Sequence, residues 1–220
     1  MFGFIKKEDP HEAVIKKANS SLRTIIKKAK SIGVPEPVLR FLEIYDSFAT
    51  DSDGMPAELN NGASEEEIIA FEATLHIRLP EEYREFLKFF NCARFYEACV
   101  NICGVSKDES KYSLYEENTV SSREALTVGE DALPNSFIVI GTDDSGSVIC
   151  MDVFRGSVFV WDIDFCECYK VGESFFEYIE KELSGYIQWK KMTDKALDNV
   201  EELYWIKNMH AIWHVNEKEN

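Results

Sequence analysis

The chain lacks any apolar run long enough to cross a bilayer, which takes about 20 apolar residues in succession. Its first ten residues, MFGFIKKEDP, become charged after five positions and so lack the apolar middle region of a secretory signal peptide. We therefore predict a cytoplasmic protein without a transmembrane segment. In that compartment its six cysteines are expected to be reduced thiols.

Positive charge is also scarce, with 24 Lys and Arg against 40 Asp and Glu and a net charge of −16. Residues 1–40 carry nine basic and four acidic side chains (+5), so residues 41–220 carry 15 and 36 (−21). Phosphates would be repelled by such a surface, so direct nucleic-acid binding is not expected. An acidic protein instead attracts basic protein partners.

Catalytic and metal-binding motifs are missing as well. There is no Gly-rich phosphate loop, G-x-S-x-G elbow or Cys–His arrangement. His210 and His214 are four residues apart, but HAIWH lacks the glutamate of a zinc protease motif. Cys166 and Cys168 have no second cysteine pair or nearby histidine to complete four zinc ligands. We predict no catalytic residue, cofactor or metal site.

The N-terminal quarter of the chain is helical in pattern. Apolar residues recur every three or four positions over 10–32, within a basic surround, and a second helix is expected over about 36–49. The basic stripe suits either an anionic membrane or, more simply, this chain's own acidic remainder. Residues 50–63 are rich in Gly, Pro, Asn and Asp, which is typical of a linker.

The centre of the chain opens with two helix starts. Ser64 with Glu67 fits a capping box, and Pro80 stands where a first helical turn tolerates proline. From about residue 98 the period changes to short apolar strands, interrupted by a short helix near 121–127. The strands are read in ACVNICGV, KYSLYEE, SFIVIG, SVICMDVF and SVFVWDID, with a hairpin turn about Arg155-Gly156.

Two more helices are expected after the strands. Ser174 with Glu177 forms a second capping box, and a final helix is expected over about 194–214. The fold class is therefore α+β, a mostly antiparallel sheet of about five or six strands packed with helices, plus an N-terminal helical hairpin and a C-terminal helix.

The stretch IGTDDSGSVICMD, residues 140–152, allows two interpretations. Asp143, Asp144 and Asp152 can be read as carboxylates for a metal or for water activation. They can also be read as turn residues between two strands, with Gly146 taking the positive φ that other residues avoid. The turn is the more common use of this composition.

The order of these segments resembles the SUKH superfamily, which includes the fungal Smi/Knr regulators of cell-wall synthesis and many bacterial immunity proteins. The resemblance covers about residues 64–184. It is carried by an amphipathic helix, then Leu79-Pro80 opening a Y-x-x-F-L helix that ends in Asn91, then FIVIGTDDSGSVICMD, GSVFVWD and SFFEYIEKEL. The family usually has glycine after this asparagine, at a left-handed helix end, whereas this chain has Cys92.

The resemblance implies a domain organisation and a function. We expect a basic helical extension over 1–49, a linker over 50–63, a SUKH-like domain over 64–184 and a helical extension over 185–220. The implied function is non-enzymatic protein binding, as an immunity protein that neutralises a toxin. The charge would suit a basic toxin such as a nuclease. Two alternatives stay open: a regulatory scaffold in cell-wall or signalling assemblies, and a metal-dependent hydrolase.

Acidic and aromatic residues near the strand ends form the predicted partner-binding surface, because aromatic anchors beside charge suit a protein interface. Asp143, Asp144, Asp162 and Asp164 lie in these positions beside Phe165. The predicted site residues are Tyr115, Glu116, Asp143, Asp144, Trp161, Asp162 and Asp164.

Overall fold

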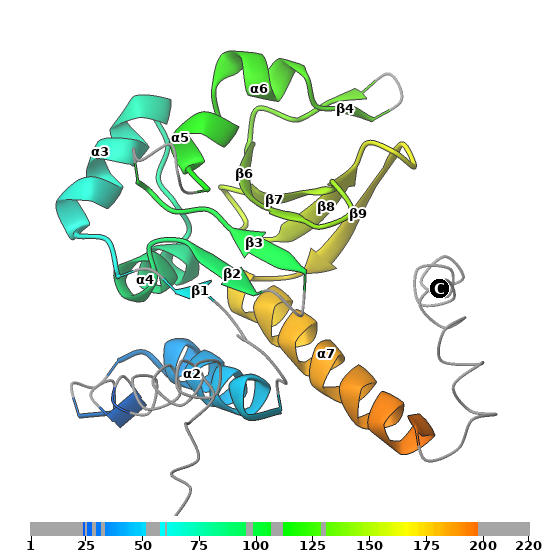
Figure 1. Ribbon diagram of the computed structural model, residues 1–220. Coiled ribbons are helices and arrows are strands. Elements are labelled where there is room, and N and C mark those ends of the chain that lie inside the picture. The colour runs from blue at the N-terminus through cyan, green and yellow to red at the C-terminus, as the bar shows by residue number, and fades with distance from the viewer. Residues whose placement is uncertain are drawn as a thin grey trace, which may run out of the picture.

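The protein has an α+β fold, as predicted, in a computed structural model that describes residues 24, 26–27, 30–31, 34–51, 58–59, 61–95, 99–106, 112–128 and 131–197 (Figure 1). A seven-stranded antiparallel sheet has the order β1-β2-β3-β6-β7-β8-β9, and β4 pairs with β5 in a separate two-stranded sheet. The two-residue edge strand β1 adds to the five or six strands expected. The helices are α2 (Glu36–Asp51), α3 (Glu65–Leu75), α4 (Glu81–Phe89), α5 (Leu114–Glu117), α6 (Val120–Glu124) and α7 (Phe175–Leu197). The strands are β1 (Glu58–Leu59), β2 (Ala93–Phe95), β3 (Val100–Ile102), β4 (Thr127–Val128), β5 (Asp131–Ala132), β6 (Phe137–Asp143), β7 (Val148–Asp152), β8 (Val158–Asp162) and β9 (Glu167–Gly172).

Helix α3 starts where its local sequence predicts. The Glu67 N–H donates to Ser64 Oγ at 3.2 Å, and the Ser64 N–H donates to Glu67 Oε2 at 2.8 Å, so the capping box is confirmed. Helix α4 begins directly after Pro80, also as predicted. The capping box holds because it satisfies backbone N–H groups that a helix leaves unpaired at its first turn. Pro80 acts differently, since it precedes α4 as the N-cap residue without a side-chain hydrogen bond.

The sheet has two apolar faces, because successive strand residues point to opposite sides. On one face, Ile138, Ile140 and Met151 join the main core with residues of α2, α4 and α7. On the other face, Val139 and Trp161 belong to a smaller cluster. Figure 1 shows α2 and α7 on one side of the sheet and the segment with α6 and β4 on the other.

Helix α2 is part of the main core. Phe41 is 3% exposed, and its ring lies 5.5 Å from that of Phe86 and 5.8 Å from that of Phe90. Before α2, Lys30 pairs with Glu43 at 2.8 Å, so one residue of the predicted basic stripe binds this chain's own acidic helix. Most of the predicted helix over 10–32 lies outside the described residues.

The segment KYSLYEE was predicted to be a strand, and this was wrong. Ser113 Oγ accepts the N–H of Tyr115, which starts α5 instead. Asn118 then fixes α5 to the sheet, because its side chain accepts from Val139 N and donates to Val139 O, both at 2.8 Å. Its amide therefore takes the place of a neighbouring strand, and this long-range contact outweighs the local strand pattern.

The C-terminal part of the domain closes with α7. The helix starts after Ser174, as predicted, and continues without a break across residues 184 and 185 to Leu197. Most of the final helix predicted over 194–214 lies outside the described residues. Helix α7 therefore spans the expected boundary and belongs both to the SUKH-like segment and to the first part of the expected C-terminal extension.

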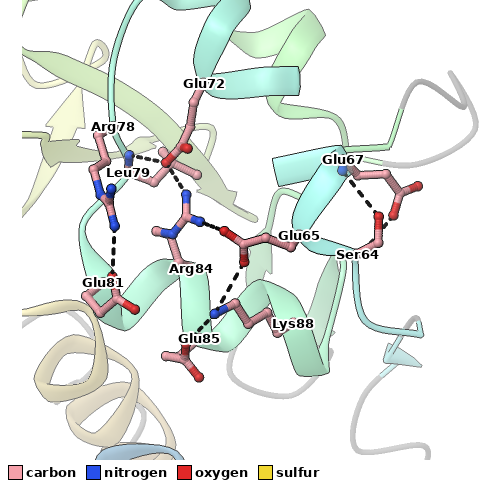
Figure 2. Close-up of polar contacts among 10 residues, drawn as sticks. All are labelled: Ser64, Glu65, Glu67, Glu72, Arg78, Leu79, Glu81, Arg84, Glu85 and Lys88. Carbon is pink, nitrogen blue, oxygen red and sulfur yellow. Dashed lines mark hydrogen bonds and ion pairs between the residues drawn. The ribbon is translucent and has the colours of Figure 1, made fainter. Parts of the chain in front are cut away.

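An ion-pair cluster joins α3 to α4 (Figure 2). The buried guanidinium of Arg84 pairs with Glu65 and, at 2.5 Å, with Glu72 Oε1. The same Glu72 oxygen accepts the N–H of Leu79 at 2.7 Å, so it also holds the connection before α4. Glu65 further pairs with Lys88 at 3.4 Å. One buried carboxylate thus ties the end of α3 to the start of α4.

Cys92 occupies the left-handed conformation in which the family usually has glycine. It has φ 88° and is buried. A non-glycine residue there costs about 1–2 kcal/mol. We expect Cys92→Gly to change the free energy of unfolding by less than about 1 kcal/mol, because released strain offsets the lost thiol. Cys92→Val adds a β-branch at positive φ and is expected to cost more than about 2 kcal/mol. Urea denaturation measures both, and an equal or greater loss for the glycine variant would contradict the assignment.

Candidate protein-binding surface

Three turns meet at one end of the main sheet. Strands β6 and β8 run in the same direction with β7 between them, so the C-terminal ends of both strands lie at the same end of the sheet. Neighbouring strands are about 4.8 Å apart, which places Asp143 and Asp162 about 10 Å from each other. The turn before β3 also lies here, because the Asp144 N–H donates to Cys99 O at 3.0 Å. The sheet topology therefore groups acids that are far apart in the sequence.

Asp143 shapes the turn between β6 and β7. Its Oδ1 accepts the N–H groups of Ser145 and Ser147, both at 2.9 Å, and the Ser145 hydroxyl at 2.6 Å. Gly146 follows with φ 92°. The turn interpretation of IGTDDSGSVICMD therefore describes this backbone, and Asp143 has a structural role in it. Its neighbour Asp144 is exposed.

The turn between β8 and β9 presents apolar side chains between acids. Asp162 Oδ1 accepts the N–H of Phe165 at 3.0 Å, which fixes the turn. Phe165 is 75% exposed and Ile163 is 38% exposed, with the exposed Asp164 between them. We call Asp143, Asp144, Asp162, Asp164, Ile163 and Phe165 the acidic turn surface.

Negative charge on this surface is not neutralised by the described part of the chain. Among the described residues, none of its four aspartates forms an ion pair, whereas Asp152 lies 4.0 Å from Arg155. Burial and then the carboxylate of Asp144 raise the pKa of the Cys99 thiol, which therefore stays protonated near neutral pH. The surface offers uncompensated negative charge at the end of the sheet that carries the exposed ring of Phe165.

The remaining predicted site residues are placed differently. Trp161 lies beside Asp162 in β8 but is 3% exposed, within the smaller apolar cluster. Tyr115 packs edge-on against Phe71 of α3, with ring centroids 5.1 Å apart. Glu116 is exposed on the same short helix, which is tied to Val139, four residues before Asp143 along β6. The structure thus brings together the four aspartates and separates Tyr115 and Glu116 from them.

Ile163 was missed by the sequence reasoning, and Phe165 was noted there only as a neighbour of the acids. The signal was present in DIDFCE, residues 162–167, because apolar residues within a tight turn cannot all face the core. Such exposed apolar residues are informative when acids surround them, since this combination resembles an interface core with a charged rim.

Side chains that could bind a metal are dispersed over the described part of the chain. No three His, Cys, Asp or Glu side chains of the described chain come together as metal ligands. Cys166 and Cys168 are free and exposed. His76, the histidine that the described ranges include, ends α3 with φ 54° and donates its backbone N–H to Glu72 O. His210 and His214 lie outside the described residues.

Comparison with known proteins places the central part of the chain in a family. The model of the SMI1 / KNR4 family (SUKH-1) matches residues 62–181, just over half of the 220 residues. The matched segment runs from before α3 into α7 and leaves out α2. No curated protein matches the chain. In the described residues, no helix combines the length and apolarity needed to cross a membrane.

Proposed function

Because the chain belongs to the SMI1 / KNR4 family (SUKH-1), as the resemblance predicted, we propose that it is a non-enzymatic protein-binding module and that its acidic turn surface binds a basic partner. The partner we propose is a toxin domain, possessing a basic active surface such as that of a nuclease, which the bound protein blocks. The protein would then act as an immunity protein in the cytoplasm of the cell that makes it.

A single observation carries this proposal: four aspartates without ion pairs among the described residues lie at the end of the sheet that also carries the exposed ring of Phe165. Exposed aromatic side chains act as anchors when a partner pocket desolvates them. The surrounding charge steers an oppositely charged partner and speeds its association. The −21 carried by residues 41–220 extends this attraction beyond the contact surface.

Charge reversal tests the proposal. We expect Asp144→Lys with Asp164→Lys to lower the association rate with the proposed basic toxin domain by about tenfold, because steering is lost. Neither carboxylate anchors the turn in the way that Asp143 does. The measurement is stopped-flow association of the purified proteins at 50 and 300 mM NaCl, over which the wild-type rate should fall by about tenfold.

Glu116→Lys is the matched control, because it makes the same charge change on an exposed residue away from this surface. It should alter the rate by less than threefold, the effect of net charge alone. Phe165→Ser should mainly speed dissociation, because it removes the proposed anchor. An association rate indifferent to salt, or equal losses for Glu116→Lys and the double variant, would rule out this surface.

A further inference from the structure

Cysteine occupies most of the left-handed positions that are not glycine. Of the four non-glycine residues with positive φ in the described part of the chain, three are Cys92, Cys99 and Cys166. A side chain is disfavoured in this conformation, which usually selects glycine or asparagine. Cys99 and Cys166 are exposed in turns, whereas Cys92 is 4% exposed. The thiol of Cys92 is therefore explained neither by its backbone conformation nor by exposure.

Cys92 lies across from a second buried cysteine. Strands β2 and β3 are antiparallel, and Ala93 is opposite Ile102. One more step along both chains places Cys92 opposite Cys103. The two chains stay adjacent beyond this step, since a Cβ added to Gly104 would lie 2.7 Å from the backbone nitrogen of Cys92. The end of α4 and the end of β3 thus bring two thiols together from positions 11 residues apart.

The hydrogen bonds of Cys103 indicate a close pair. The N–H and C=O of a residue in an antiparallel strand point to the same neighbouring strand, and cross-strand pairs without mutual hydrogen bonds have Cα atoms about 4.5 Å apart. The Cys103 N–H donates to Ile140 O of β6 at 2.8 Å, so its backbone N–H points away from β2. A disulfide spans Cα atoms about 4.4–6.8 Å apart. Cys92 and Cys103 are therefore within the range that a disulfide can bridge.

Both thiols are enclosed by the folded protein. Cys103 is fully buried, and both residues are reduced in the structure. Burial, and then the Glu117 carboxylate and the Cys92 thiol, raise the pKa of Cys103 well above its usual range. Since the thiolate is the form that attacks a disulfide, reaction requires an opening that admits water.

Strand β2 is well placed for such an opening. It is separated from the edge of the sheet by β1, which has two residues (Figure 1). Elements with few neighbours open locally at a lower free energy than the centre of a sheet. Local opening of β2 therefore exposes Cys92 and Cys103 while β6, β7 and β8 stay folded.

We propose that Cys92 and Cys103 form an oxidation site, at which a low-molecular-weight disulfide such as oxidised glutathione links them across β2 and β3. The Cys92 thiolate, which has lost its proton to solvent, attacks one sulfur of the reagent and releases a thiolate that takes up a proton. The Cys103 thiolate then attacks the Cys92 sulfur of the mixed disulfide and releases the second reagent thiol. Two protein thiols are oxidised by two electrons, and one reagent disulfide is reduced to two thiols.

The link braces the β2–β3 hairpin. It closes the chain over residues 92–103, which restricts the unfolded chain and stabilises the fold. In a reducing cytoplasm both residues stay thiols, and the link forms when low-molecular-weight disulfides accumulate. This inference is independent of the partner proposed for the acidic turn surface.

Peptide mapping of the whole protein tests the site. The protein is incubated with oxidised glutathione at about pH 8, where more of each thiol is ionised. Incubation continues until the β2 amides of a parallel sample have exchanged in D₂O, so that every molecule has opened. The remaining thiols are alkylated in urea before digestion with trypsin. Arg94 separates the two cysteines, so we expect FFNCAR (residues 89–94) linked to FYEACVNICGVSK (residues 95–107).

Cys99 is the competing thiol, because it is exposed and lies in the same peptide as Cys103. We expect fragment ions to place the link at Cys103, while Cys99 carries glutathione or the alkyl group. A link at Cys99, or alkylation of both Cys92 and Cys103 at the end of the incubation, would overturn the proposal.

Urea denaturation gives a second measurement. The linked protein should unfold at a midpoint about 1 M higher than the reduced protein. Cys92→Gly is the matched control, since it provides the residue usual in the family and removes one sulfur, and its midpoint should not rise on oxidation. Cys103→Ala gives the same readout if the glycine variant does not fold. An equal rise in wild type and in either variant would attribute the stabilisation to other thiols and overturn the brace.

Discussion

Phe41→Ala is expected to lower the free energy of unfolding by about 3–5 kcal/mol, the usual cost of replacing a buried phenylalanine by alanine. Phe41 is 3% exposed and contacts rings of α4, β2 and α7, namely those of Phe86, Phe90, Phe95 and Phe176. Its loss leaves a cavity where three elements of the family domain meet. Since domains are stable by about 5–15 kcal/mol, the change would remove a large share of the total. Urea denaturation followed by circular dichroism measures it.

Arg40→Ala on the same helix is the control. Arg40 is exposed and pairs with Glu180 at the surface, where an ion pair contributes about 0–1 kcal/mol. If Phe41→Ala were no more destabilising than Arg40→Ala, α2 would be an appendage packed loosely on the domain. The larger loss would establish that the family domain of this protein includes a helix from outside the matched segment.

Local signals predicted the ends of the elements well. The capping box of Ser64 and Glu67 and the positive φ of Gly146 depend on residues within a few positions, so the sequence contains all the needed information. By contrast, α5 depends on the contact of Asn118 with Val139, 21 positions away. Strand β9 was not predicted. Its first five residues alternate between intermediate and exposed positions, because it lies at the edge of the sheet and lacks a long apolar run.

Charge in the candidate site was predictable, but its aromatic anchor was less so. Alternation along a strand shows that Trp161 shares a face with other apolar residues, yet it cannot show that Leu126 and Leu133 cover that face. The exposure of Phe165 could be predicted from the sequence, because the residue lies inside a tight turn. The role of α2 was also hidden, since an apolar stripe indicates burial without identifying the partner surface.

Arg84→Met is expected to lower the free energy of unfolding by about 3–5 kcal/mol, because it leaves the carboxylate of Glu72 buried without its cation. The side chain of Arg84 is 5% exposed and that of Glu72 is 11% exposed, so water can replace the lost partner only in small part. Burial opposes ionisation of Arg84, but Glu72, Glu65 and Glu81 outweigh it and raise the pKa of the guanidinium. Urea denaturation of the variant measures the loss.

The double variant Arg84→Met with Glu72→Gln separates the ion pair from the shape of the site. The amide oxygen of glutamine can still accept the N–H of Leu79, while no charge remains buried. We expect the double variant to recover at least half of the loss, because replacing both partners of a buried pair is often nearly neutral. An additive loss would mean that Glu72 acts mainly by packing. Recovery would instead show that Glu72, beside Phe71 in the sequence that resembles the family, places α4 and the main core on which the sheet and its acidic turns rest.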